Sequence, residues 1–480
     1  MSTIDFVILI GYVLGCTWLG VRLGRGATGL KGYFLGESDI PTWAVMVSIV
    51  ATETSTATFL SVPAIAFKGD FTYLQLAIGY MVGRIIVSAL LLPAYFRGEI
   101  FTAYQVLDQR FGGLTKTAAS VLFLITRTLG DGLRLYLAAL VLRELTGWSM
   151  PISIVAMGAT TIVYTFLGGM KAVIWTDVIQ FFIYNLGAVT ALVVLVGELP
   201  GGWSELVAAG AEAGKFRLFD FGFDLTRPYT FWAGLIGGAV LNTATHGADQ
   251  IMVQRYLSAR GERQAATALI VSGVVVFAQF ALFLLIGVGL FVFYREFPPG
   301  VALPKDGEFT WFIPRYLPTG VVGLVIAAIF SAAMSTLSSS LNASASATIN
   351  DLYRPLRPET DEATLLRLSK AFTVVWGLAQ MGTAIAATYL LQDNVVNNAL
   401  AIASFITGIV LGLFLLGTLT TSVQQPHALI GLAVGAAVVT SVKFLTPIAW
   451  PWYACIGSIT VFFAGCAASA LARLGSSTSA

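Results

Sequence analysis

The chain has 480 residues, of which 57% are hydrophobic and only 11% are charged, whereas a soluble domain carries about 25% charged residues. A soluble fold could not hide that much apolar surface, because part of every fold must face water. The composition therefore predicts an integral membrane protein. A net charge of +2 with two histidines indicates no nucleic-acid partner, and three scattered cysteines indicate neither a disulfide framework nor a cysteine metal site.

Apolar runs divide the chain into predicted membrane-spanning helices, since a helix needs about 20 apolar residues to cross the hydrocarbon core. By this criterion we predict about thirteen spans. They cover residues 5–23, 42–66, 70–96, 115–145, 151–168, 172–199, 230–256, 264–294, 318–349, 366–391, 394–420, 426–446 and 452–473. The connectors are too short for a further domain, so we expect one transmembrane domain over residues 1–480.

The amino end and the loops predict how the chain lies in the membrane. Residues 1–5 carry an acid instead of a basic region, so we expect the first run to be retained as a helix and not cleaved as a signal peptide. Lys and Arg are more frequent in the loops that follow odd-numbered spans, and cytoplasmic loops are the ones enriched in these residues. We therefore predict a multi-pass protein of the inner (cytoplasmic) membrane with its amino end outside and its carboxyl end in the cytoplasm.

The second predicted span contains an unusual polar run at residues 48–58, with Glu53 in its middle. Hydroxyl and β-branched residues are poor helix formers, so the run predicts a broken helix whose freed carbonyls could coordinate an ion, as in secondary transporters. The alternative is an intact helix whose hydroxyls bond back to carbonyls one turn earlier.

The fourth and sixth predicted spans carry charges that lipid would not tolerate alone. Arg127, Asp131 and Arg134 are spaced four and three residues apart, so they share one helix face. They indicate either a self-neutralising packing cluster or a set of solute-binding or gating charges. Asp177, followed by Gln180, lies either within the membrane or at its inner surface as a helix cap.

The seventh predicted span is interrupted by a polar, glycine-containing stretch at residues 242–250, which includes Asn242, His246 and Asp249. It lies five spans after the run around Glu53. Two broken helices in corresponding halves of a transporter point to a binding site near the middle of the membrane.

The ninth predicted span places Ser335, Ser338, Ser339 and Asn342 at steps of three and four residues, so they form a stripe on one helix face. Neutral oxygen ligands suit an alkali cation, which prefers hard donors. Close packing of small residues between helices is the alternative explanation.

Taken together, these segments resemble the sodium–solute symporter family, which includes the proline, sialic acid and galactose symporters. The resemblance rests on YFLG at residues 33–36, GGMKAV and TDVIQ within residues 168–180, VQRYL at residues 253–257, AAMSTLS at residues 332–338 and NDLY at residues 350–353. It implies an all-α, LeuT-like fold of two inverted five-helix repeats. The first repeat would cover residues 42–199 and the second residues 230–420, with one helix (5–23) before them and two (426–473) after.

The resemblance also implies two sodium sites. The ligands of the first would be the carbonyls of Ala51, Thr54 and Ala332 and the hydroxyls of Ser335 and Thr336. The ligands of the second would be Asp177, Ser335, Ser338 and Ser339. Sodium would be the only metal, acting as the coupling ligand, and no other cofactor is expected.

The resemblance leaves the solute open, because the pocket residues of no single member are all present. Glu53 replaces the aspartate of the proline symporter, Gly130 lies near the position of the sialic acid symporters' arginine, and His246 replaces an aromatic residue of the galactose symporter. The candidate solute-binding residues are Glu53, Gln75, Asn242, His246, Asp131 and Arg134. We predict sodium-coupled symport of a sugar, amino acid or carboxylate by alternating access. A proton-coupled transporter and a membrane sensor without net transport are the alternatives, and no nucleophile paired with a base indicates an enzyme.

Overall fold

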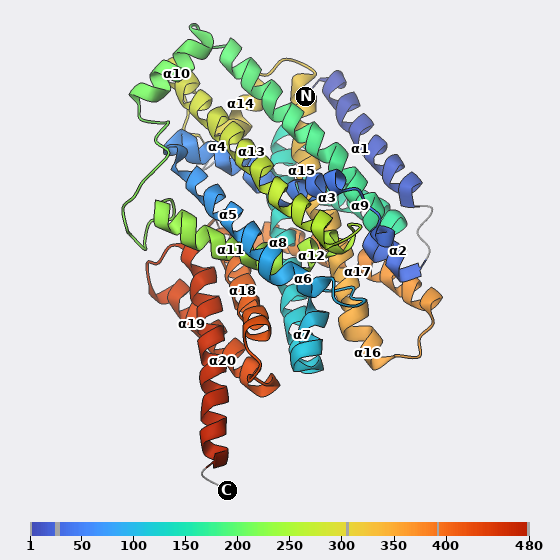
Figure 1. The fold of residues 1–480 in the computed structure, drawn as a ribbon. Coiled ribbons are helices and arrows are strands. Elements are labelled where there is room, and N and C mark those ends of the chain that lie inside the picture. The colour runs from blue at the N-terminus through green and yellow to red at the C-terminus, as the bar shows by residue number, and fades with distance from the viewer. Residues whose placement is uncertain (1, 25–28, 304–306, 391–392, 478–480) are drawn as a thin grey trace.

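The computed structural model describes residues 2–24, 29–303, 307–390 and 393–477, and within these ranges the secondary structure is all helix, without a strand. Figure 1 shows a bundle with the two termini at opposite ends. The first half contains α1 (Thr3–Gly24), α2 (Gly29–Leu35), α3 (Thr42–Glu53), α4 (Thr56–Lys68), α5 (Leu74–Ile86), α6 (Leu92–Tyr95), α7 (Tyr104–Phe111), α8 (Gly113–Thr146), α9 (Met150–Gly197) and α10 (Gly202–Glu212). The second half contains α11 (Gly238–Gly247), α12 (Gln250–Leu257), α13 (Glu262–Glu296), α14 (Glu308–Tyr316), α15 (Val321–Ala347), α16 (Arg354–Leu356), α17 (Glu362–Leu390), α18 (Asp393–Leu419), α19 (Gln425–Leu445) and α20 (Tyr453–Ser477).

Eight helical segments of the described chain are long and apolar enough to cross a bilayer, and the bent pair α3–α4 would make a ninth. The eight are Thr3–Leu23, Phe71–Tyr95, Met150–Gly197, Glu262–Glu296, Val321–Leu356, Glu362–Leu390, Gln425–Leu445 and Trp450–Leu474. The other predicted spans fall on α8, which carries several charges, on the divided pair α11–α12, and on α18. Each of the predicted ranges thus coincides with helix, and the total of about thirteen spans stays a prediction.

The fifth and sixth predicted spans are joined in α9, which runs through both ranges. The join is at Gly169, whose φ of 56° and ψ of −155° are not helical. A side chain there would meet the Tyr33 carbonyl oxygen at 2.5 Å. Glycine at this position therefore permits both the turn in the chain and the close approach of α2.

The break predicted around Glu53 is confirmed. α3 ends at Glu53, α4 begins two residues after Thr54, and the two helices are bent by 62°. Thr54 is extended, and Ser55 caps α4 by accepting a hydrogen bond from the Thr58 amide at 3.4 Å. Hydroxyl residues favour such caps over helix interiors, which explains why the chain breaks within this run.

The second predicted interruption is confirmed as well. α11 ends at Gly247, and α12 begins at Gln250 with Asp249 as its N-cap. The Asp249 carboxylate accepts a hydrogen bond from the Ile251 amide at 2.9 Å. Both halves of the chain therefore contain a helix that is broken at polar residues.

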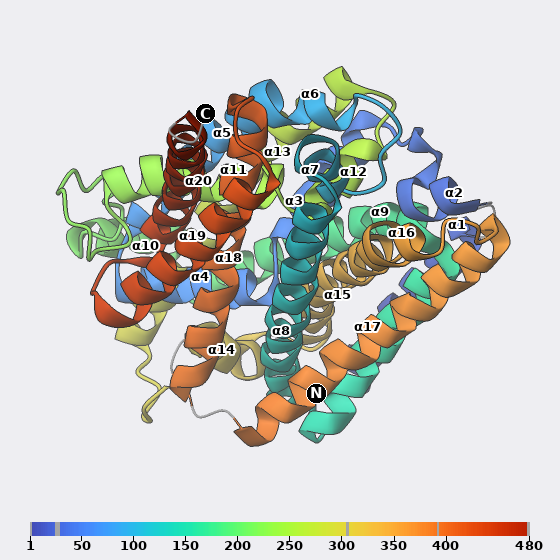
Figure 2. The ribbon, with the colours of Figure 1, turned by 90° about the horizontal axis from the view of Figure 1, so that it is seen from below.

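α15 forms the centre of the bundle, packed against α3, α8, α9 and α17. Figure 2 shows it surrounded by these helices, with the α19–α20 hairpin at the periphery. Alanine and serine make up most of its second half, and small side chains allow neighbouring helices to approach closely. The serine-rich stripe is consequently buried at the centre of the protein.

Candidate functional site

The residues predicted for the first sodium site lie on α3, at its broken end, and on the facing stretch of α15. Thr336 Oγ1 donates to the Thr52 carbonyl at 3.4 Å and to the Ala332 carbonyl at 3.2 Å. The α4 end of the break is tied to the same helix, since Thr56 Oγ1 donates to the Ile329 carbonyl at 3.2 Å. All five predicted ligands, Ala51, Thr54, Ala332, Ser335 and Thr336, are buried.

The residues predicted for the second sodium site are brought together around Asp177, which is fully buried. Its carboxylate accepts hydrogen bonds from Ser335 Oγ at 2.6 Å and from Ser48 Oγ at 2.5 Å. Ser339 is linked to the same cluster through Thr52 Oγ1 at 3.2 Å. The Ser338 hydroxyl donates instead to the Ser335 carbonyl at 3.1 Å. Asp177 therefore lies inside the protein and not at an interfacial helix cap.

Arg255 on α12 belongs to this cluster, although the sequence did not indicate a role for it. Its guanidinium lies 2.9 Å from the Asp177 carboxylate, donates to Ser48 Oγ at 2.9 Å, and contacts Ser339 Oγ. The side chain is 1% exposed. In this conformation a guanidinium therefore provides the positive charge that sodium would bring to the same oxygens. Arg255 lies within the VQRYL motif, but only the tertiary structure shows that its side chain on α12 reaches Asp177 on α9.

A cavity of about 250 Å³ lies beside the ion-site residues. Glu53, Asn242, His246 and Arg134, four of the six predicted solute-binding residues, line it. Three further lining residues have other predicted roles: Thr336 as a sodium ligand, Arg127 in the charge set of α8 and Asp249 in the polar stretch of the seventh span. The sequence did not single out the remaining principal lining residues, which are Thr52, Tyr73, Tyr80, Thr245 and Phe280. Because Thr52 and Thr336 also meet at the broken end of α3, the cavity and the residues predicted for the first sodium site share a wall.

Glu53 is paired with a buried arginine that sequence analysis missed. Arg84 on α5 makes an ion pair with the Glu53 carboxylate and donates from Nε to Ser272 Oγ at 3.2 Å. His246 Nε2 lies 3.5 Å from both the carboxylate and the guanidinium. Arg84 is fully buried, whereas Glu53 is 14% exposed, so the carboxylate is the partner that reaches the cavity.

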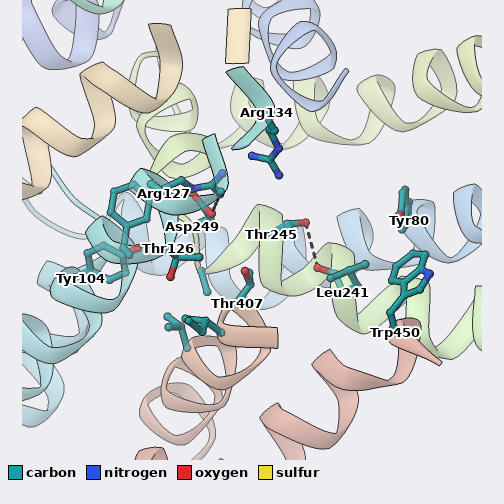
Figure 3. Close-up of a pocket in the computed structure, with 15 residues that line it drawn as sticks. Tyr80, Tyr104, Thr126, Arg127, Arg134, Leu241, Thr245, Asp249, Thr407 and Trp450 are labelled. Atoms are coloured by element: carbon teal, nitrogen blue, oxygen red, sulfur yellow. Dashed lines mark hydrogen bonds and ion pairs between the residues drawn. The ribbon is translucent and has the colours of Figure 1, made fainter. Parts of the chain in front are cut away.

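The charge cluster on α8 extends to the second broken helix. Asp131 is buried between Arg134, with which it pairs, and Arg127, at 3.8 Å. Arg127 also pairs with Asp249, at the α11–α12 break, as Figure 3 shows. Asp131 does not line the cavity, so its role is to hold the two arginines that do.

A second cavity of about 270 Å³ adjoins the first and shares Tyr80, Arg127, Arg134, Leu241, Thr245 and Asp249 with it. In Figure 3, Tyr80 and Trp450 lie at one side of this cavity and Tyr104 at the other. Thr407 on α18 contributes a hydroxyl. The shared residues place the Arg127–Asp249 pair at the boundary of the two cavities.

Gln75, the remaining predicted solute-binding residue, is not brought to either cavity. Its Nε2 donates to the Thr72 carbonyl at 2.9 Å and the Tyr229 carbonyl at 3.2 Å, while its Oε1 accepts from the Asp220 amide at 3.1 Å. The side chain therefore holds the loop that precedes α11 at two points, Asp220 and Tyr229.

We expect Gln75→Leu to lower the free energy of unfolding by about 1–3 kcal/mol, because three backbone groups would each lose a hydrogen bond to the Gln75 amide. The apparent affinity for solute should stay unchanged. Thermal unfolding and uptake kinetics would check both expectations, with Gln264→Leu at an exposed position as the control. If Gln75→Leu lowered the affinity for solute but not the stability, Gln75 would be a solute-binding residue.

The chain is similar in sequence and in fold to known sodium-coupled transporters. The model of the sodium:solute symporter family matches residues 33–435. The chain is 30% identical to the sodium/sialic acid symporter NanT of Aliivibrio fischeri, covering 97% of this chain and 92% of that protein. It is 29% identical to the human sodium/iodide cotransporter, covering 88% of this chain but only 66% of that longer protein. A solved structure of a substrate-bound, outward-open Na⁺-coupled sialic acid symporter superposes with a TM-score of 0.90 at 29% identity, covering 98% of each chain.

Proposed function

The chain belongs to the sodium:solute symporter family, and we propose that it carries a small polar organic solute across the cytoplasmic membrane together with sodium. The main support for this proposal is a residue shared by the solute cavity and the proposed sodium site. Thr336 lines the solute cavity and also donates to the Thr52 carbonyl at the broken end of α3. An ion bound there would therefore shape the cavity directly.

We propose two sodium sites, each built from oxygen ligands that hard cations prefer. The first comprises Ala51, Thr54, Ala332, Ser335 and Thr336, where the broken helix leaves carbonyls without helical partners. The second comprises Asp177, Ser335, Ser338 and Ser339. The hydrogen bond between Ser335 and Asp177 supports a connection between the two sites.

Coupling between sodium and solute follows from thermodynamic linkage. Sodium would order the end of α3 against α15, and Glu53, the last residue of α3, would then be fixed at the cavity wall. Two ligands are coupled only when both favour the same conformation, so solute must raise sodium affinity as much as sodium raises solute affinity. We propose that the doubly bound state closes the outer access and opens the inner one.

The cavity wall supports a solute with several hydrogen-bonding groups. Asn242 Oδ1 is a buried acceptor without a hydrogen-bond partner among the described residues, and a solute hydroxyl or amine would satisfy it. Arg134 is 34% exposed, so its guanidinium is accessible to a solute carboxylate. We therefore propose a sugar, amino acid or carboxylate, bound by Glu53, Asn242, His246 and Arg134. The relatives' names include sialic acid, iodide and monocarboxylate transporters, which fits a family with varied solutes.

The proposed orientation has the amino end outside and the carboxyl end in the cytoplasm, as the distribution of Lys and Arg indicates. Single introduced cysteines at the two ends, probed with a membrane-impermeant maleimide in intact cells, would test this. Labelling of the carboxyl end from outside would contradict the orientation.

Thermal unfolding in sodium against matched potassium tests the proposed coupling ion. A ligand that binds only the folded state raises its apparent stability, so we expect sodium to raise the unfolding temperature of the wild type. Ser335→Ala/Thr336→Ala should lose this effect. Ser344→Ala, further along α15, should keep it and serves as the control for removing a buried hydroxyl. If saturating sodium leaves the wild type unchanged, uptake driven by a pH gradient would favour a proton-coupled transporter.

A further inference from the structure

The loop between α10 and α11 contains an aromatic segment, residues 219–225, in which apolar and polar residues alternate. The side chains of Phe219, Phe221, Phe223 and Leu225 are 42%, 63%, 70% and 40% exposed. Asp220 and Asp224 alternate with these apolar residues along the chain, and both are half-buried. A loop surrounded by water would be expected to expose its acidic residues and to cover its aromatic rings. The exposure in this segment is the opposite.

The acidic side chains of the segment bond within the loop, and one backbone amide connects the segment to α5. Asp224 accepts hydrogen bonds from the Thr226 amide and hydroxyl, at 2.8 and 2.7 Å. Asp220 pairs with Arg227, and its backbone amide donates to Gln75 Oε1 at 3.1 Å. A Cβ at Gly222 would lie 3.1 Å from the Asp220 carboxylate. Position 222 therefore lies on the same side of the segment as Asp220. The hydrogen bond from the Gly222 amide and the neighbouring Arg227 lower the pKa of Asp220. The polar side is therefore charged. On the apolar side, Phe219 and Phe221 contact each other and Phe231, but the four apolar residues stay largely exposed.

Two contacts place the segment level with the end of membrane-spanning helices. The Ala449 amide donates to the Leu225 carbonyl at 2.8 Å, and Ala449 directly precedes the apolar span Trp450–Leu474. Trp232, at the start of the helical stretch leading into α11, donates from Nε1 to the Phe221 carbonyl at 3.3 Å. The end of a spanning helix lies at the bilayer surface, where aromatic side chains concentrate.

The helices beside the segment also present apolar side chains outward. Phe444 and Leu445, at the neighbouring end of α19, are 59% and 80% exposed, and Figure 1 shows α19 and α20 at the edge of the bundle. The exposed rings of the segment thus continue a lipid-facing surface and do not face the solute cavities.

We propose that the aromatic segment is a membrane-interface anchor, which inserts Phe219, Phe221, Phe223 and Leu225 among the lipid headgroups and upper acyl chains. It holds the loop before α11 at the bilayer surface while the acidic face stays with the protein. Apolar surface next to a polar face is the pattern of segments that lie in the interface. This inference rests on the chain spanning a membrane and is independent of which ion or solute it carries.

Spin labelling of the full-length protein in lipid nanodiscs tests the anchor. Cys16, Cys455 and Cys466 would be replaced by alanine, and one label would be attached at Phe221→Cys, Phe223→Cys or, as the control on the opposite face, Asp224→Cys. Oxygen partitions into lipid, whereas a polar nickel complex stays in water. We expect the ratio of oxygen to nickel accessibility to be severalfold higher at positions 221 and 223 than at position 224.

Two outcomes would overturn the proposal. Higher nickel than oxygen accessibility at positions 221 and 223 would mean that the rings face water. Low accessibility to both reagents, with spin–spin broadening between labels, would mean that a second copy of the chain covers them. Sodium-dependent thermal stabilisation of each labelled protein would show that it is folded, and an absent sodium effect in correctly inserted protein would count against the coupling ion and not against the anchor.

Discussion

Glu53→Gln should lower the free energy of unfolding by about 3–5 kcal/mol and abolish uptake, because it leaves the guanidinium of Arg84 charged and without its carboxylate in a buried position. Arg84 is fully buried and its Nη1 has no hydrogen-bond partner among the described residues, so losing the carboxylate would leave a further donor of the guanidinium unpaired. Thermal unfolding and sodium-driven uptake in proteoliposomes would measure the two effects. The same substitution at Glu144, which is 60% exposed, should change neither.

The double variant Glu53→Gln/Arg84→Met separates the structural role of Glu53 from its role toward the solute. Replacing both members of a buried ion pair by uncharged side chains is often neutral for stability, so we expect the double variant to recover most of the lost stability. Uptake should stay absent if the Glu53 carboxylate contacts the solute. If the double variant regained uptake, the role of Glu53 would be only to hold α3 against α5.

Arg255→Gln should lower the free energy of unfolding by about 3–5 kcal/mol in potassium, and sodium should reverse much of this loss. The substitution leaves the Asp177 carboxylate buried without a positive partner. Sodium bound among Asp177, Ser335 and Ser339 would restore that charge, so the stabilisation by sodium should exceed that of the wild type. Thermal unfolding over a range of sodium concentrations would measure the difference.

Two variants control this experiment. Arg263→Gln removes an exposed arginine and should behave as the wild type. Asp177→Asn/Arg255→Gln removes both charges, so the additional stabilisation by sodium should disappear. If sodium stabilises Arg255→Gln no more than the wild type, the cluster around Asp177 is a structural ion pair and the protein has one sodium site.

The sequence by itself determined the class of the protein and the places where its helices break. Its apolar content requires lipid as the solvent, and spanning helices must satisfy their own backbone groups. The run around Glu53 and the stretch from Asn242 to Asp249 hold residues that cap helices well and continue them poorly, so local chemistry alone predicts both interruptions.

Only the tertiary structure decided which charges meet. Arg84 and Arg255 lie 31 and 78 residues from the acids they pair with, and such distant pairs leave no periodic pattern along the chain. Gln75 is among the predicted solute-binding residues, yet its side chain bonds to the loop before α11. A helix face can be predicted from spacing, but the partner of that face depends on how the helices cross. That is why the sequence placed the predicted ion-site residues on their helices, whereas the arginines that pair with the buried acids emerged only from the fold.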